Sequence, residues 1–480
     1  MKREKKIIKS GITFLAIFSI VFIFLNKAFS SIYYYTNTIE DFKSLSNKTN
    51  IDLIFYGSSH SYTAYNPVIF NKKCKTVSYN LGSDGLRMIF TDLIFEESLK
   101  YTHPKLVVLE VYSSSLTMPE TKEAKGYQLR GLDFISNFSI NKAIKVNQVY
   151  EPKEYLGVYS TLIRNHEKWN DLNLSQRYNF DKNRVYYNSG FVGSYRIIKE
   201  NDKLKFKDFK TKKNNQKTIK NSLTEQSKRE LQRFINIAKQ NGIKVLIVSS
   251  PDLRSFYLKE NIFKGLEFFS AKNNIDYINL NNYYKEIGLT IEDFRDPGHL
   301  NSYGANKTSE YLAKYISEHF ILKNRSNDVV WQKIEKEYDN YKESITIYKP
   351  KVVYEKTLNK RLTEGVILKD FKIIKKNRLL KIIFNLKTDK SLLNSMRLGV
   401  NLYPTNKELK HLSSKRKESG YNFESKNTII NDSEKAQIEI ITSINEIEKI
   451  KVFLYDKEKY NGVIGETIWI NEFIPLNHTK

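Results

Sequence analysis

The chain has 480 residues, of which 40% are hydrophobic, so two or three domains with full-sized cores are expected. Its formal net charge is +26, but the lysines are spread along the whole chain, which argues against a nucleic-acid-binding motif. The single cysteine, Cys74, excludes an intrachain disulfide and a cysteine-based zinc site, and we expect neither a metal nor a cofactor.

The N-terminus has a basic flank followed by an uncharged apolar run, residues 11–25. Adjacent apolar residues, 7–8 and 28–35, lengthen this run to what a membrane-crossing helix needs. We predict that residues 1–35 form a cytoplasmic basic tail and a single transmembrane signal anchor in the cell membrane, with the rest of the chain outside. Two alternatives are a buried core helix and a signal peptide cleaved near Ala28-Phe29-Ser30, which would give a secreted protein.

Five short apolar runs predict the strands of a parallel sheet. Each is rich in β-branched residues, as expected of strands that are covered on both faces. Helical periodicity between them, clearest over residues 223–241, gives the strand–helix alternation of a doubly wound α/β domain. The five runs are residues 51–56, 76–79, 105–111, 243–249 and 275–280.

We assign residues 36–325 to this α/β domain and, within it, residues 117–220 to an insertion of helices and loops that caps the sheet. Residues 326–343 are expected to form a linker helix, and residues 344–480 a β-rich accessory domain of the sandwich type that could bind glycan. Its predicted strands are residues 345–348, 351–354, 379–386, 397–403, 437–441 and 450–455. The tryptophans Trp169, Trp331 and Trp469 could stack on sugars, although core packing is expected for at least two of them.

A serine-rich motif, Gly57-Ser58-Ser59-His60-Ser61, directly follows the first predicted strand. The carboxyl ends of parallel strands form the crevice in which doubly wound folds place their sites. Gly57 permits a tight turn there, and a serine in such a turn can lie at the start of the next helix, near backbone N–H groups. The motif alone is equally typical of an ordinary turn.

A second motif, Asp296-Pro297-Gly298-His299-Leu300-Asn301, lies far downstream and precedes an amphipathic helix over residues 305–320. Proline and glycine between Asp296 and His299 predict a turn that lets both side chains face one site. The histidine can then act as a general base that the carboxylate orients. Asn301 or Ser302 is expected to cap the following helix, and a capping loop with an incidental histidine is the alternative.

Together the two motifs resemble the SGNH/GDSL-like hydrolase superfamily over roughly residues 50–320, with the insertion unmatched. The resemblance implies a flavodoxin-like doubly wound fold, with Ser59 as the nucleophile, His299 as the base and Asp296 as its orienting carboxylate. The variants found here are most similar to anchored proteins that modify cell-envelope polymers. These include alginate O-acetylation proteins and the D-alanyl-transfer protein of teichoic-acid modification.

The resemblance also implies an oxyanion hole with three donors. The first two are the backbone N–H groups of Ser59 and of Gly82, which follows the second strand. The third is an asparagine after the third strand, where this chain has Tyr112-Ser113-Ser114-Ser115 instead. Asn80, a serine hydroxyl and Tyr112 are the candidates to replace it, and a missing donor would lower the rate by about 10²–10³-fold.

Four further residues are candidates for lining the site. Glu110 and Tyr112 lie at the end of the third predicted strand, and His60 follows Ser59 in the serine motif. Arg87 follows the Gly82 loop and could bind an anionic substrate. Solvated strand-end, turn and surface roles are the alternatives for these side chains.

We therefore expect an extracytoplasmic serine esterase or O-acyltransferase that acts through an acyl-Ser59 intermediate on acyl groups, mainly O-acetyl, of a cell-surface polysaccharide. The expected partners are a cell-surface glycan or teichoic-acid polymer, the membrane and a membrane-bound O-acyltransferase. Two alternatives are D-alanyl transfer to teichoic acid and a non-catalytic scaffold for a membrane-bound O-acyltransferase.

Overall fold

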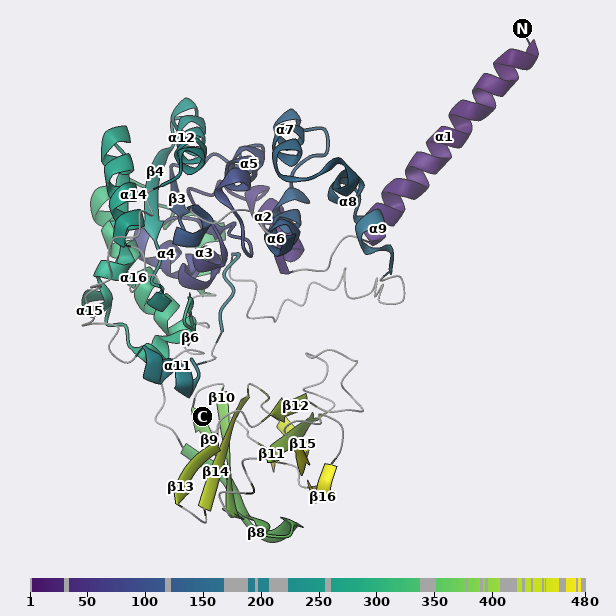
Figure 1. Cartoon of the computed structure of the whole chain (residues 1–480). Helices are drawn as coiled ribbons and strands as arrows, with labels where there is room; N and C mark the ends of the chain where they lie inside the picture. The colour runs from purple at the N-terminus through teal and green to yellow at the C-terminus, as the bar shows by residue number, and fades with distance from the viewer. Residues whose placement is uncertain are drawn as a thin grey trace. The chain divides into compact units, whose positions relative to one another are not determined.

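The computed structural model divides the chain into two units, Met1–Asp339 and Asn340–Lys480 (Figure 1). The structure describes residues 2–29, 34–116, 122–167, 189–194, 197–206, 223–254, 260–336, 351–376, 379–388, 392, 396–405, 421–424, 428–432, 435–442, 444, 446–456, 463–471 and 474–475. The predicted strand over residues 345–348 lies outside these ranges.

The first unit is built around a five-stranded parallel sheet with the order β2-β1-β3-β4-β5. This is one of the two common orders of doubly wound sheets. Each strand overlaps its predicted run, so the prediction of a parallel α/β sheet is confirmed. The strands are β1 (Leu53–Tyr56), β2 (Ser78–Asn80), β3 (Leu106–Glu110), β4 (Lys244–Ser249) and β5 (Asp276–Asn279).

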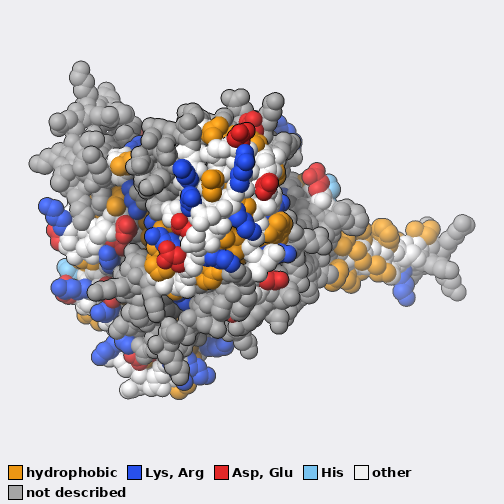
Figure 2. Space-filling model, turned by 90° about the horizontal axis from the view of Figure 1, so that it is seen from below, with side chains coloured by type: hydrophobic (Ala, Val, Ile, Leu, Met, Phe, Trp, Pro, Cys, Tyr) orange, Lys and Arg blue, Asp and Glu red, His pale blue; other side chains and the backbone are white. Residues whose placement is uncertain are grey.

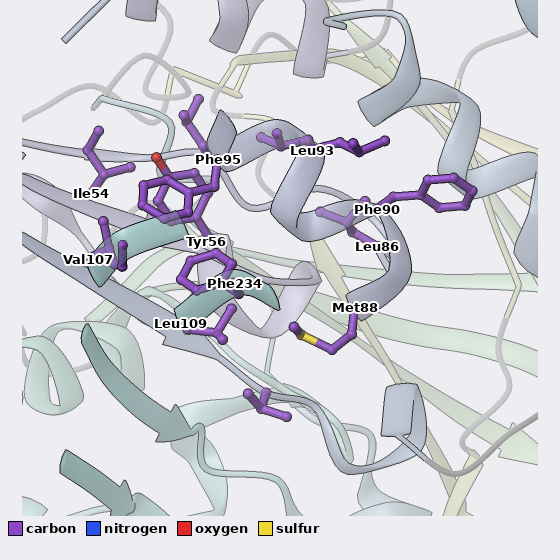
Figure 3. Close-up of a cluster of buried hydrophobic side chains, with 14 of the residues drawn as sticks. Ile54, Tyr56, Leu86, Met88, Phe90, Leu93, Phe95, Val107, Leu109 and Phe234 are labelled. Carbon is purple, nitrogen blue, oxygen red and sulfur yellow. The ribbon is translucent and has the colours of Figure 1, made fainter. Parts of the chain in front are cut away.

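Helices cover both faces of this sheet. Successive strand residues point to opposite sides, so each face has its own hydrophobic core. On one face, Tyr56 of β1 meets Phe95 of α5 and Phe234 of α12, with ring centroids 4.6–5.7 Å apart (Figure 3). On the other face, Phe55 packs with residues of α4 and α16. The helices named in this article are α1 (Lys2–Ala28), α2 (Tyr34–Ser46), α3 (Ser59–Ala64), α4 (Pro67–Cys74), α5 (Met88–Ser98), α6 (Lys122–Leu132), α7 (Ile140–Val149), α8 (Tyr155–Tyr159), α9 (Thr161–Asn165), α11 (Glu200–Lys205), α12 (Glu225–Gln240), α14 (Glu260–Asn273) and α16 (Ser302–His319).

The predicted insertion contains α6 to α9 and α11 in its described part, so it is helical there as expected. Phe134 and Val146 join the core on the α5 side of the sheet, which makes this part of the insertion an extension of the fold. The predicted linker helix is also packed: Trp331 and Ile334 are buried in the same core. These apolar contacts explain why the first unit extends to Asp339.

Helix α1 carries a stretch, Ile7–Ala28, with a mean hydropathy of 2.3 and no buried share. Figure 2 shows hydrophobic side chains over most of the projecting rod that α1 forms. The stretch is long and apolar enough to cross a membrane or to serve as a signal sequence. A buried core helix, one of the two alternatives, is contradicted because every residue from Ile7 to Val21 is exposed; among the described residues, only the last turn of α1 contacts the rest of the first unit, through α9.

The second unit consists of two antiparallel sheets, with the orders β13-β14-β10-β9-β8 and β12-β11-β15-β16. Ile382 and Phe371 of the first sheet and Val400 and Val452 of the second belong to one hydrophobic core. Strands β9, β12, β13, β16 and β17 were not predicted. In β9 and β16 the apolar residues are interrupted by Lys369-Asp370 and by Gly465-Glu466-Thr467, so neither strand has a continuous apolar run. The strands are β8 (Lys351–Thr363), β9 (Val366–Lys376), β10 (Leu379–Thr388), β11 (Met396–Pro404), β12 (Tyr421–Glu424), β13 (Thr428–Asp432), β14 (Lys435–Thr442), β15 (Glu446–Asp456), β16 (Val463–Ile470) and β17 (Ile474–Pro475).

Candidate active site

The serine motif forms a sharp turn between β1 and α3. Gly57 has a φ of 141°, which side chains rarely tolerate, and a Cβ there would lie 2.7 Å from the Glu110 carbonyl oxygen. Ser58 is the N-cap of α3, and its hydroxyl accepts the His60 N–H at 3.2 Å. Ser59 is therefore the first residue of α3, just beyond the carboxyl end of β1, an interior strand of the sheet.

The second motif forms a two-stranded turn, β6 (Phe294–Asp296) and β7 (His299–Leu300). Asp296 Oδ1 accepts the backbone N–H groups of Gly298 at 2.9 Å and His299 at 3.0 Å, which fixes the turn. Asn301 caps α16 by accepting the N–H groups of Tyr303 and Gly304. The capping role predicted for Asn301 or Ser302 thus falls to Asn301.

The two motifs, 240 residues apart, meet in one hydrogen-bonded row. The Ser59 Oγ lies 2.7 Å from His299 Nε2. On the other side of the ring, His299 Nδ1 lies 2.9 Å from Asp296 Oδ1 and 3.1 Å from Oδ2. This is the arrangement in which an imidazole can remove a serine proton while a carboxylate holds the ring.

The charge state of Asp296 suits that arrangement. Burial raises the pKa of this carboxyl, but the hydrogen bond and charge of His299, the Gly298 N–H and Arg295 outweigh burial and hold the pKa below its usual range. Arg295 Nε lies 3.4 Å from Asp296 Oδ2. Asp296 is consequently a carboxylate over the whole working pH range, as a group that stabilises a charged imidazole must be.

His60, the residue after the serine, lies within a stack of rings. Its ring centroid is 4.1 Å from that of Tyr112 and 4.6 Å from that of His299, with interplanar angles of 16° and 20°. Burial, followed by the nearby charges of His299 and Arg254, holds the pKa of His60 well below its ordinary value. A neutral His60 can pack flat on His299 without repelling the positive charge that a general base acquires.

Glu110 lies directly beneath the turn that carries Ser59. Its Oε2 accepts the N–H of Ser58 at 3.1 Å and the Ser58 hydroxyl at 3.0 Å. Its Oε1 is buried and has no hydrogen-bond partner among the residues that the structure describes. Burial raises the pKa of Glu110 to about 8, against which the two bonds from Ser58 act only in part. Glu110 is therefore a neutral acid at neutral pH that supports the turn.

The candidate oxyanion donors Gly82 and Asn80 are bonded to each other. The Gly82 N–H donates to Asn80 Oδ1 at 3.0 Å. The Asn80 side-chain amide donates to the carbonyls of Ser61 and Tyr65, at 3.1 and 3.0 Å. These bonds tie the Gly82 loop to α3, so both residues have a structural role here, and Gly82 would have to change its acceptor to bind an oxyanion.

Arg87 stands at the N-cap of α5, where its backbone N–H donates to Gln128 Oε1 at 2.9 Å. Its side chain is half-buried. Arg87 thus stands at the start of α5, the helix that follows the Gly82 loop, and its backbone N–H links that start to Gln128 of α6.

Two features of the site were not predicted. The first is Arg254, after β4, whose guanidinium lies over the Tyr112 ring and pairs with Asp252 at 3.3 Å. The same guanidinium lies so close to Gly298 that a Cβ at position 298 would overlap it. Residues 189–194 of the insertion return to the site, where the carbonyl oxygens of Ser189 and Ser194 accept the N–H groups of Asn80 and Ser302. The only available signal for Arg254 was its place after a predicted strand, and residues 189–194 carried none beyond two glycines.

No protein-family model matches the sequence, and no curated protein matches it. Among solved structures, a candidate acylhydrolase from Bacteroides fragilis NCTC 9343 is similar with a TM-score of 0.28 and 11% identity, over 58% of this chain and 94% of its own. A gut microbial diltiazem-metabolizing enzyme has a TM-score of 0.24 and 10% identity, over 74% and 58% of the two chains. A two-domain esterase active on acetylated mannans has a TM-score of 0.24 and 9% identity, over 93% and 96%. Two of the three carry an acylhydrolase or esterase name.

Proposed function

We propose that this protein is a serine acyl-esterase or O-acyltransferase of the SGNH type. The observation that carries the proposal is the row Ser59 Oγ, His299 Nε2, His299 Nδ1 and Asp296, with 2.7 and 2.9 Å between the bonded atoms. The row stands at the carboxyl end of β1, an interior strand of a parallel sheet, and doubly wound folds bind their substrates at this edge.

The chemistry follows from these contacts. As the Ser59 oxygen attacks an ester carbonyl, its proton passes to His299 Nε2, and Asp296 stabilises the resulting imidazolium. The tetrahedral intermediate collapses when the C–O bond to the alcohol breaks and His299 returns the proton to the leaving oxygen. An acyl-Ser59 ester remains, and either water or an acceptor hydroxyl then attacks it with His299 again as the base.

The oxyanion donors bear on the rates of both acylation and deacylation, because each step passes through a tetrahedral oxyanion. The N–H of Ser59, at the first position of α3, has no intrahelical acceptor, which supports its role as an oxyanion donor. The Gly82 N–H is already bonded to Asn80. With one donor available, we propose that both steps are slow, and that a polymer hydroxyl is the preferred acceptor because binding holds it beside the acyl-Ser59 ester.

We further propose that the substrate is an O-acetylated cell-surface polysaccharide and that α1 anchors the enzyme in the cell membrane with its N-terminus in the cytoplasm. The basic flank and the apolar length of α1 support this location. A membrane-bound O-acyltransferase is the proposed acyl source for the transfer reaction. The polymer and this partner rest on the resemblance of the two motifs to anchored envelope-modifying proteins.

The acyl-Ser59 intermediate can be trapped directly. Full-length protein in detergent micelles, mixed with a chromogenic acetyl ester and quenched in acid, is expected to carry an acetyl group on the peptide that contains Ser59. Mass spectrometry of the digest measures it, and a D-alanyl ester run in parallel tests the alternative acyl group. Chromophore release without an adduct on Ser59 would contradict a serine enzyme that acts through Ser59. If neither chromophore release nor an adduct is seen, the result would favour the non-catalytic scaffold.

The second unit carries a surface suited to a polymer. On the outer face of β11 and β15–β16, the rings of Tyr403 and Trp469 lie 5.6 Å apart. Lys449 lies over both rings, at 4.8 and 5.6 Å from their centroids, and Lys451 lies 5.5 Å from that of Trp469. Trp469 is 41% exposed, whereas Trp331 is in a core and Trp169 lies outside the described residues. We propose that this aromatic and basic surface, Tyr403, Lys449, Lys451 and Trp469, binds an anionic glycan.

Replacing Trp469 by alanine is expected to weaken binding of the full-length protein to an anionic polysaccharide about tenfold, the equivalent of about 1.4 kcal/mol, because a stacking face is lost. Trp469→Phe keeps an apolar ring and should retain most of the affinity. Microscale thermophoresis with labelled polymer measures both variants. Equal affinities for wild type and Trp469→Ala would remove this surface from the proposal.

A further inference from the structure

Exposed apolar side chains occur in α7, α8 and α9 and in the turn before α7, and α9 contacts α1. Phe138 is 97% exposed, Ile140 77% and Leu156 67%, and Ile144 and Ile163 are exposed to a lesser degree. Isolated exposed hydrophobic residues are ordinary on soluble proteins, but a local group of large ones indicates an interaction surface. We refer to Phe138, Ile140, Ile144, Leu156 and Ile163 as the apolar rim.

The apolar rim is joined to the end of α1 by hydrogen bonds. Asn26 Oδ1 accepts the Ser160 hydroxyl at 2.8 Å and the Leu162 N–H at 3.2 Å, and the Asn26 carbonyl accepts the Thr161 hydroxyl at 2.5 Å. Asn165 Nδ2 donates to the Phe29 carbonyl at 2.9 Å. Helix α9 therefore holds the last turn of α1, and Figure 1 shows α9 and α8 beside its base.

The remaining rim residues are connected to α9 through α8 and α7. The Asn137 side chain, next to Phe138, donates to the Tyr159 carbonyl at the end of α8, and the Tyr155 hydroxyl of α8 donates to Asn147 of α7 at 2.5 Å. In α7, Lys142, Lys145 and Val146 are buried. At 100° per residue, Ile140 and Ile144 lie on the opposite side of the helix, away from this packed face.

The length of α1 places the apolar rim at the level of a bilayer surface. The 22 residues of Ile7–Ala28 rise about 33 Å, close to the thickness of the hydrocarbon core. A bilayer crossed by this helix ends near Asn26 to Ala28, which is where α9 binds α1. The surfaces beside that point meet lipid headgroups, where apolar side chains on an amphipathic surface gain by insertion.

We propose that the apolar rim inserts into the outer membrane–water interface, so that the first unit lies on the bilayer instead of moving freely on α1. The occupant is the lipid surface itself, because the rim is continuous with the end of the spanning helix. Insertion would hold the site at a fixed height above the membrane. The proposal rests on α1 spanning a bilayer and is independent of the chemistry at Ser59.

Fluorescence quenching by lipid tests this in the full-length protein. In a Cys74→Ser background, single cysteines replace Phe138, Leu156 or Phe268, each is labelled with an environment-sensitive dye, and the protein is placed in nanodiscs with or without brominated acyl chains. Phe268 of α14 is 75% exposed and lies outside the rim, which makes it the matched control. Ile17→Cys, within α1, reports whether the helix is in the bilayer.

Labels at positions 138 and 156 are expected to be quenched about twofold or more by brominated lipid, while the label at position 268 is unchanged. Quenching at position 17 alone would overturn the proposal, as would the absence of quenching at all four positions. Shielding of positions 138 and 156 that arises only when another membrane protein is added would also overturn it, in favour of a protein partner. Circular dichroism checks that each variant is folded, which is expected because the substituted side chains of the rim are exposed.

Discussion

Replacing Ser59 by alanine is expected to lower kcat for a chromogenic acetyl ester by about 10³- to 10⁶-fold, because the hydroxyl proposed to form the acyl ester is removed. The substitution removes the 2.7 Å hydrogen bond between the Ser59 hydroxyl and His299 Nε2. Its loss leaves His299 oriented by Asp296 at 2.9 Å, so the rest of the site keeps its geometry. Initial rates for the two proteins in detergent measure the effect.

Ser317→Ala is the matched control. Ser317 is exposed on α16, and its hydroxyl donates only to the Lys314 carbonyl of the same helix at 2.7 Å. This variant should keep the wild-type rate, and both variants should unfold at the wild-type temperature. Ester turnover that survives in Ser59→Ala would show that another residue, or a contaminant, carries the reaction.

The sheet was predictable because its interior strands β1, β3 and β4 are nearly continuous apolar runs, which strands buried on both faces require. The β1 run, for example, is buried at every residue from Leu53 to Tyr56. The second unit was only partly predictable, since β9 and β16 have one face toward solvent and their apolar runs are interrupted by polar or charged residues. Core packing was expected for at least two of the three tryptophans, but the core that Trp331 joins could not be specified, because a tertiary contact with the sheet domain leaves no periodic signal in a short helix.

The triad could be proposed from the sequence because each motif specifies its own local geometry. The turn after β1 needs the positive φ that Gly57 adopts. The Asp296 carboxylate closes its own turn by accepting two backbone N–H groups. The contacts among the loops around the triad could not be predicted from local sequence. The bond of Gly82 to Asn80 and the position of Arg254 against Gly298 depend on where separate loops meet in space.

Glu110 is the second residue for which a large effect is expected, this time on stability. Its carboxyl is neutral in the folded protein up to about pH 8, because burial opposes ionisation, and it ionises near pH 4.5 when exposed. Below pH 4.5 Glu110 is protonated in both the folded and the unfolded protein, so the stability that the neutral carboxyl contributes is fully present. Between about pH 4.5 and 8 the unfolded chain alone loses the proton, so this contribution declines by about 1.4 kcal/mol per pH unit.

Glu110→Gln should abolish that decline, because the amide stays neutral at every pH and its oxygen can still accept the N–H and hydroxyl of Ser58. The free energy of unfolding of the wild type, minus that of the variant, is expected to fall steadily from about pH 5 to about pH 8 and to level off above it. Urea unfolding of the full-length protein measures both, with loss of ester turnover marking the transition of the first unit. Glu310→Gln, at an exposed position of α16, should run parallel to the wild type. Parallel curves for Glu110→Gln as well would mean that Glu110 is already ionised beneath the turn, and that the buried carboxylate is stabilised by more than the two bonds from Ser58.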